Sequence, residues 1–179
     1  AAITASGGIS EFLLHDLVPN STIKDILKLV ILNEKNPMSY NNTLVAEYDG
    51  EVIAAANYYP SKAHGVPNLM KEFLPENRIL HMKNFYDSRV PDSLYIHMLA
   101  VLPDYRYTSA AMDLLYALKK IAITEGLSCL SAHVWADNLM VLKALEISEF
   151  TIQEKVPVER HALLPHDGGM LLMKGPALP

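Results

Sequence analysis

The clearest chemical pattern in this sequence is an apolar run that ends in a turn with an arginine and continues as a helix. It lies in the stretch LAVLPDYRYTSAAMDLLYALKKIA, residues 99–122, and the turn carries Arg106. The first turn of a helix presents backbone N–H groups without intrahelical partners, and the helix dipole adds partial positive charge there. These groups and the Arg106 guanidinium are suited to hold phosphates. On spacing alone, a plain strand-to-helix turn with a surface arginine is the commoner alternative and stays open.

Titratable side chains on the apolar run before this turn are candidates for proton transfer. The run SLYIHMLAV, residues 93–101, contains Tyr95 and His97. A histidine there could act as a general base, and a hydrogen-bonded core histidine is the alternative. None of the seven histidines has a tight metal-ligand spacing. His161, His166 and Asp167 share one loop, but loop histidines are commonly solvated, so we expect no metal site.

The apolar patterns predict the elements that must position these groups. Asp49-Gly50 between two strand-like runs predicts a tight hairpin, and the continuous run over 93–101 predicts a strand buried on both faces. In the first half of the chain we expect an edge strand over 11–18, a helix capped by Ser21, the hairpin within 42–59 and one or two short helices within 60–92. The second half begins with the strand 93–101 and a helix over 108–125 between Thr108 and Gly126. A strand over 127–135, a short helix after Asn138, and strands over 149–160 and 169–174 follow.

This order describes a mixed α/β sheet covered by helices, with a parallel, right-handed strand–helix–strand unit at its centre. The chain has 179 residues, which fits a single domain over 1–179 with a helical insertion at about 60–92. The formal net charge of −5 leaves no basic excess to neutralise phosphates, so we expect no nucleic-acid partner.

Two further features bear on the compartment. No apolar run approaches the roughly 20 residues that span a bilayer, so we expect no membrane association. Cys129 is the only cysteine, so no disulfide can form within the chain, and we expect a cytoplasmic protein.

Three features resemble the GNAT superfamily of N-acetyltransferases. The family's acetyl-CoA loop reads Arg/Gln-x-x-Gly-x-Gly/Ala, and residues 106–111 here match its arginine and final small residue, with Ser109 at the first glycine. Asn138 lies 12 residues before Phe150, at the family spacing, although Glu149 replaces the glycine of the family's Gly-Phe pair. The hairpin VAEYDGEVIAAANYY resembles the family's second and third strands. The resemblance covers about residues 42–150 and implies the GNAT fold: α/β, with a mixed, mostly antiparallel central sheet flanked by helices.

The resemblance implies that acetyl-CoA is the cosubstrate and that the acceptor is a primary amine of a small molecule or peptide. The strand end would pair with the pantetheine arm through backbone groups, the loop would hold the pyrophosphate, and the asparagine would contact the pantetheine. The implied cosubstrate-binding residues are Leu99, Ala100, Val101, Arg106, Tyr107, Thr108, Ser109, Ala110, Ala111 and Asn138. Dimers are common in the family, so a homodimer is one expectation.

The resemblance also frames the mechanism. Many family members have a tyrosine seven residues after the asparagine that can protonate the departing thiolate, and here that position is Leu145. The thiolate of a thiol with a pKa of about 8.5 leaves with little help. An amine with a pKa of about 10.4 is protonated at neutral pH and needs a base to remove its proton. We expect His97 to be that base, with Tyr95 as the fallback, and residues 60–92 to form part of the acceptor pocket. A non-catalytic acyl-CoA-binding module of the same fold and a structural interaction domain remain the alternatives.

Overall fold

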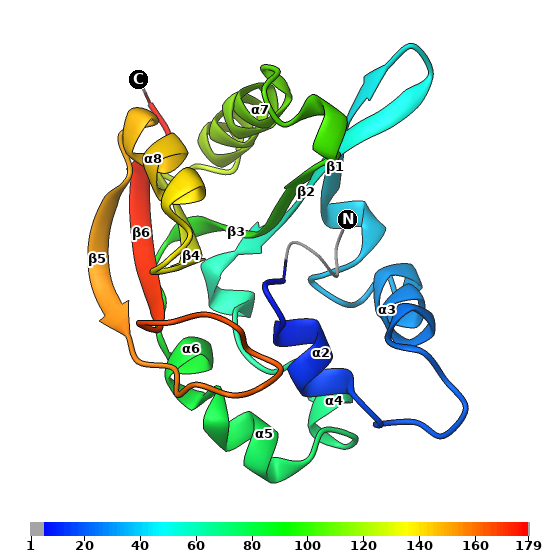
Figure 1. Ribbon diagram of the computed structural model, residues 1–179. Helices are drawn as coiled ribbons and strands as arrows, with labels where there is room; N and C mark the ends of the chain where they lie inside the picture. Colours follow the sequence, from blue (N-terminus) through cyan, green and yellow to red (C-terminus); the bar gives the residue numbers. More distant parts are fainter. Residues whose placement is uncertain (1–5, 179) are drawn as a thin grey trace.

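A six-stranded sheet forms the centre of the protein, in the order β1-β2-β3-β4-β6-β5 (Figure 1). The computed structural model describes residues 6–178, apart from the side chains of residues 68 and 69. Only β3 and β4 pair in parallel, so the predicted mixed, mostly antiparallel sheet is confirmed. The strands are β1 (Thr43–Tyr48), β2 (Glu51–Pro60), β3 (Ser93–Val101), β4 (Cys129–Trp135), β5 (Thr151–Val156) and β6 (Met170–Pro176).

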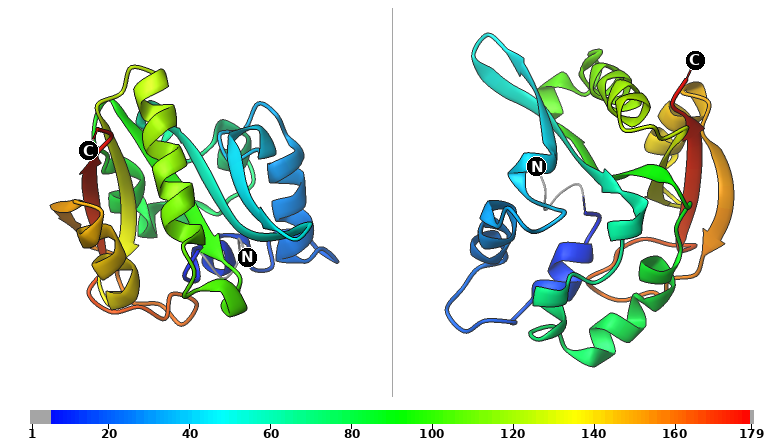
Figure 2. Two further views of the ribbon diagram at one scale, coloured as in Figure 1. Left: turned by 90° about the horizontal axis from the view of Figure 1, so that it is seen from above. Right: turned by 180° about the vertical axis from the view of Figure 1, so that it is seen from behind.

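Helices cover both faces of this sheet. Helices α7 and α8 lie on one face, and α2, α5 and α6 lie on the other, as Figure 1 shows and Figure 2 repeats from above and from behind. The α-helices are α2 (Ile9–Leu14), α3 (Ile23–Leu32), α4 (Asn68–Lys71), α5 (Glu76–His81), α6 (Lys83–Asp87), α7 (Ala110–Thr124) and α8 (Leu139–Ile147), and the short 3-10 helices are η1 (Tyr40–Asn42), η2 (Ser61–Ala63) and η3 (Pro103–Tyr105). None of the helices in the described part of the chain is long and apolar enough to cross a membrane.

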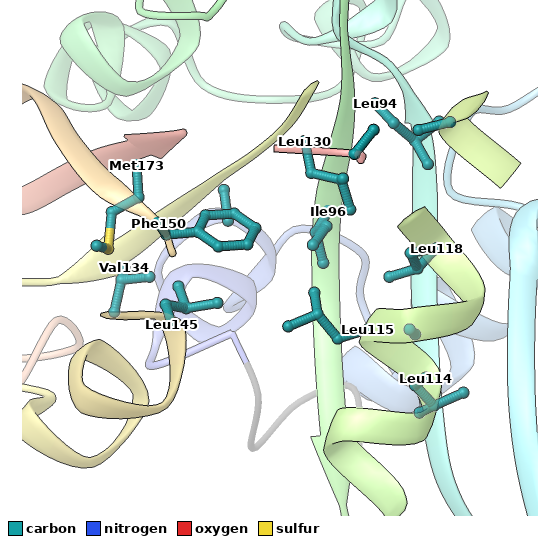
Figure 3. Close-up of a cluster of buried hydrophobic side chains, with 14 of the residues drawn as sticks. Leu94, Ile96, Leu114, Leu115, Leu118, Leu130, Val134, Leu145, Phe150 and Met173 are labelled. Carbon is teal, nitrogen blue, oxygen red and sulfur yellow. The ribbon is translucent and has the colours of Figure 1, made fainter. Parts of the chain in front are cut away.

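The core beneath α7 explains why the central strands and this helix hold together. Leucines at positions 114, 115 and 118 of α7 are at most 4% exposed and face Leu94, Ile96 and Leu130 of the sheet (Figure 3). The strands also offer the alanines at 54 and 56 to this helix, and small residues there let α7 lie close to the sheet. Full burial of leucine and isoleucine side chains stabilises the fold by about 1.5–3 kcal/mol each.

The parallel pair β3 and β4 separates halfway along its length. Pairing runs only from Ser93–Ile96 on β3 to Cys129–Ala132 on β4. On its other side, β3 pairs with β2 along nearly its whole length, except that His97 is skipped between Ile96 and Met98. This bulge changes the direction of β3 where the separation begins. We call the space between residues 97–101 of β3 and residues 133–135 of β4 the strand gap.

The predicted hairpin is confirmed at Asp49-Gly50. Their φ angles of 50° and 77° are those of a tight turn with two left-handed residues. Helix α7 ends at Thr124, and the expected stop at Gly126 follows directly, with a φ of 74° and a bond from the Leu127 N–H to the Ala122 carbonyl.

Two predictions at the N-terminal end are wrong. Residues 11–18 form no strand, because helix α2 over Ile9–Leu14 buries Phe12, Leu13 and Leu14 in succession. A short unbroken apolar run is compatible with either element, and periodicity alone could not separate them. The next helix is capped by Thr22 instead of Ser21, because the Thr22 side chain accepts from the Asp25 N–H while the Asp25 carboxylate accepts from the Thr22 N–H.

Glu149 adopts a backbone conformation that favours glycine. Its φ is 68°, at the end of α8 and directly before the buried Phe150, which is 3% exposed. Left-handed backbone costs a residue with a Cβ roughly 1–2 kcal/mol. Glycine avoids this cost, but it loses more conformational entropy on folding, so only part of the energy is recovered.

We therefore expect Glu149→Gly to stabilise the protein by about 1 kcal/mol, which corresponds to a rise in Tm of roughly 2–4 °C for a chain of this size. Thermal unfolding followed by circular dichroism measures the shift. Glu149→Ala is the matched control, because it removes the same charge but keeps the Cβ and should not stabilise. An equal gain in both variants would assign the effect to charge instead of backbone strain.

Candidate functional site

The strand gap leaves one edge of a central strand without a partner. Residues 97–101 of β3 pair with β2 on one side and have no ladder partner in β4 on the other. The N–H and C=O groups of this edge are therefore available to a ligand that lies extended along it. The predicted pairing residues Leu99, Ala100 and Val101 lie on this edge, and all three are partly exposed.

The predicted phosphate-binding turn follows directly at the end of β3. After η3, residues 106–109 lead into α7, and Arg106 through Ser109 are all exposed. The Thr108 hydroxyl accepts from the Ala110 N–H at 3.3 Å. Within the described residues, the N–H groups of Ser109, Ala111 and Met112 have no such bond, because the Ser109 side chain does not cap the helix. Three free amides and one guanidinium at a helix start can hold an anion.

The turn does not require the glycine that Ser109 replaces. Ser109 has φ −73° and ψ −6°, and Arg106 has φ −62° and ψ −22°, so both use ordinary right-handed backbone. The cost of the serine lies in its side chain. The Ser109 hydroxyl donates to the Asp113 carboxylate at 2.7 Å, which holds a negative charge in the first turn of α7. That charge opposes an anion bound at the same helix start.

Asn138 lies at the end of β4 and begins α8. Its side-chain oxygen accepts from the Val141 N–H at 3.4 Å, so half of the amide is used to cap the helix. The amide NH₂ group has no bond to any described residue and can donate to a ligand. Leu145 lies on α8, seven residues after Asn138. It is 8% exposed and packs in the core beneath α7, so no proton donor occupies that position.

His97 stands where the strand gap opens. Its Nδ1 lies 3.2 Å from the hydroxyl of Tyr59 on β2, and the imidazole is exposed although protein surrounds it on several sides. Partial removal from water, with a smaller contribution from nearby His64, lowers the pKa of His97 below its usual value. Burial raises the pKa of Tyr59 well above its usual range, so its hydroxyl keeps its proton. His97 is therefore neutral at pH 7, and its Nε2 forms no bond to another described residue.

Tyr95 is placed very differently from His97. It is 2% exposed, and its hydroxyl lies 2.9 Å from Nδ1 of His133 on β4. The other ring nitrogen of His133 lies 2.8 Å from the Ser88 hydroxyl, which itself donates to the Phe85 carbonyl. Ser88 therefore accepts from the His133 Nε2–H, and the Tyr95 hydroxyl donates to Nδ1. Burial raises the pKa of Tyr95 and lowers that of His133, to about 3.

The insertion predicted at residues 60–92 packs against this group. His64 is 5% exposed and stacks on His133 with ring centres 5.1 Å apart, and its ring centre lies 4.4 Å from that of Tyr95. Its Nε2 donates to the Phe85 carbonyl at 2.9 Å. Burial lowers the pKa of His64. Sequence reasoning missed the roles of Tyr59, His64 and Ser88. They carry no local motif and their partners are distant in the sequence, 38 residues away for Tyr59 and His97 and 45 for Ser88 and His133.

The remaining candidate residues lie apart from this group. His166 pairs with Asp137 at 2.7 Å, and Arg160 pairs with Asp167 at 3.3 Å, while the His161 ring contacts Phe12. Across residues 6–178, no three histidine, cysteine, aspartate or glutamate side chains gather in a way that could hold a metal ion.

Comparisons with known proteins agree with this fold. The family model of the GNAT acetyltransferases matches residues 19–146. An N-acetyltransferase from Staphylococcus aureus Mu50 has a similar structure, with a TM-score of 0.65 at 16% identity over 97% of this chain and 91% of that one. A crystal structure of an acetyltransferase has a TM-score of 0.59 at 19% identity, over 97% of this chain and 95% of that one. The ribosomal-protein-S18-alanine N-acetyltransferase from Escherichia coli has a TM-score of 0.52 at 16% identity, over 98% of this chain and 87% of that one.

These structural likenesses concern the fold, since all are below 20% identity. No curated protein sequence matches the chain significantly. The family model covers well over half of the chain and includes the hairpin, β3, the turn at residues 106–109, α7, β4 and most of α8. The chain therefore belongs to the GNAT family of acetyltransferases.

Proposed function

We infer that this protein transfers an acetyl group from acetyl-CoA to a primary amine. The observation that carries the proposal is the strand gap, because it places a free strand edge in line with a helix start that has unpaired amides. The edge at residues 97–101 suits an extended, amide-containing arm, and the start of α7 suits a pyrophosphate. The residues that would hold the cosubstrate are Leu99, Ala100, Val101, Arg106, Tyr107, Thr108, Ser109, Ala110, Ala111 and Asn138.

His97 is the residue that we propose as the general base. Acetyl-CoA supplies the activated acetyl group, and the new C–N bond forms as the C–S bond breaks and the thiolate leaves. The amine must lose a proton for this, and Nε2 of His97 can accept it in the tautomer that carries its hydrogen on Nδ1, beside the Tyr59 hydroxyl. Tyr95 is a weaker candidate, because its buried hydroxyl already donates to His133.

Departure of the thiolate requires less assistance from the protein. A thiol with a pKa near ~8.5 is a good leaving group at neutral pH, so the apolar Leu145 is compatible with transfer. We also propose that the insertion at residues 60–92 forms part of the acceptor pocket. Contacts of its residues His64 and Ser88 with side chains beside the strand gap support this role.

A non-catalytic acyl-CoA-binding module of the same fold is the second candidate. The Asp113 carboxylate at the start of α7 favours it, because this charge weakens the hold on a pyrophosphate. Incubation of the protein with labelled acetyl-CoA and a panel of primary amines separates the two functions. Acetylated amine supports transfer, whereas tight binding without turnover on any amine supports the module.

Acetyl-CoA affinity tests the phosphate-binding turn. We expect Arg106→Ala to weaken binding roughly ten- to hundredfold, the usual effect of losing a charge-assisted contact. Asp113→Asn should strengthen binding about two- to fivefold at low ionic strength, because it removes a like charge at the helix start. Isothermal titration calorimetry measures both changes.

Two variants near the other end of α7 serve as controls. Lys120→Ala removes the same charge as Arg106→Ala, and Glu125→Gln removes the same charge as Asp113→Asn, so neither should alter affinity by more than twofold. Equal affinities in wild type and Arg106→Ala would place the pyrophosphate elsewhere.

The pH dependence of turnover tests His97. We expect His97→Ala to lower kcat roughly 10²- to 10⁴-fold. In the wild type, removal from water lowers the pKa of His97 to about 4, so the base should be lost by protonation only as the pH falls toward 4. Rates of acetyl transfer from the pKa of His97 up to pH 9 measure both effects. His15→Gln, at the protein surface, is the control, and an unaltered rate and profile in His97→Ala would remove His97 from the mechanism.

A further inference from the structure

Trp135 leaves a buried hydrogen-bond donor unused beside the strand gap. It is the last residue of β4, only 5% exposed, and its indole Nε1–H has no acceptor within residues 6–178. Strand residues two apart share a face, so Trp135 lies on the same side as His133, roughly 7 Å further along. An unpaired buried donor is costly, typically about 1–3 kcal/mol, so its presence at this position calls for a partner.

His166 provides a hydrogen-bond acceptor directly next to this donor. Its ring lies parallel to the indole, with centroids 4.6 Å apart and an angle of 12° between the planes. Nδ1 lies 2.7 Å from Oδ1 of Asp137, whose other oxygen accepts from the Asp167 N–H at 2.9 Å. Partial burial raises the pKa of Asp137, but these hydrogen bonds outweigh it and lower the pKa overall. The Asp137 carboxylate therefore accepts from the Nδ1–H of His166, and in the neutral form of this imidazole Nε2 presents a lone pair.

A single ligand group could reach both atoms. A Cβ built on Gly7 would lie 2.2 Å from Trp135 Nε1 and 2.8 Å from His166 Nε2, so one position in space lies beside both the donor and the acceptor, nearer to the donor than a hydrogen bond. Gly7 itself, with a φ of 55°, now covers this position. Gly8 follows with a φ of 90°, and a Cβ there would lie 2.3 Å from the Leu163 carbonyl. The chain thus uses Gly7 to lie against the indole and the imidazole, and Gly8 to lie against the backbone of Leu163.

We propose that Trp135 and His166 form a subsite for a carboxamide group of the acceptor, and that residues 6–8 cover this subsite until the acceptor displaces them. A primary or secondary carboxamide carries one acceptor, its C=O, for the indole N–H, and one donor, its N–H, for His166 Nε2. A plain alkylamine whose amino group lies at the thioester has no second polar group for either atom. This assignment rests on the proposed acetyl transfer, because it takes the face that carries His97 and His133 as the acceptor side.

Fluorescence of the single tryptophan tests the subsite without any acetyl transfer. The probes are L-leucinamide and 3-methylbutylamine, two primary amines that differ only in the carboxamide. We expect leucinamide to change the emission of Trp135 at concentrations about tenfold lower than 3-methylbutylamine does. His166→Phe keeps the stacked ring but removes Nε2, and should abolish this preference. His15→Gln is the matched control and should retain it.

Gly7→Ala tests the cover. The added Cβ cannot fit against the indole, so we expect red-shifted emission and tighter leucinamide binding, with an unchanged circular dichroism spectrum. Equal responses to both amines in the wild type, or no response to either, would overturn the subsite. Unchanged emission in Gly7→Ala would overturn the cover.

Acetyl transfer is measured separately with the same two amines. Failure of transfer with a retained leucinamide preference would refute the proposed function and leave the subsite in place.

Discussion

The structure depends on the point at which β3 and β4 stop pairing. Four residue pairs, from Ser93–Ile96 to Cys129–Ala132, hold the two halves of the sheet together, and the pairing ends at the His97 bulge. Backbone groups in the middle of a sheet normally pair, because an unsatisfied buried group costs about 1–3 kcal/mol. Here the free edge of β3 is retained, and the residues of the proposed site lie around it. The predicted phosphate-binding turn continues from its end, Asn138 follows the opposite strand, and His97 stands at its start.

The packing on the two faces of the sheet separates two chemical environments. The α7 face is a core of leucine and isoleucine with small alanines on the strands, and its role is to fix the positions of β3, β4 and the start of α7. The opposite face carries three neutral histidines and two buried tyrosines close to the strand gap. Full or partial removal from water lowers the pKa of these histidines and raises the pKa of these tyrosines, so the group is uncharged at pH 7. An uncharged environment favours the neutral form of an amine, which is the form that attacks a thioester.

Two positions that are glycines in the family show different physical outcomes in this chain. Ser109 adopts right-handed backbone, so the substitution leaves the turn intact and acts through the side chain, which draws Asp113 toward the helix start. Glu149 adopts left-handed backbone at a φ of 68°, so the strain is kept and offset by the burial of the neighbouring Phe150. The loss of a glycine therefore has no single meaning, because its consequence depends on the φ angle that the position requires.

The sequence by itself determined the elements whose signals are local. The Asp49-Gly50 turn, the apolar run of β3, the periodic apolar face of α7 and the Gly126 stop each depend on neighbouring residues, and all four lie where the patterns placed them. The helix α2 was missed because Phe12, Leu13 and Leu14 form an unbroken run without either periodicity. Only the tertiary structure decided which side chains meet. Tyr59 and His97 are 38 residues apart, as are Tyr95 and His133, and their contacts depend on the order of strands in the sheet. The pairing of Trp135 with His166 likewise requires the loop before β6 to fold back over the end of β4, and no local pattern encodes that contact.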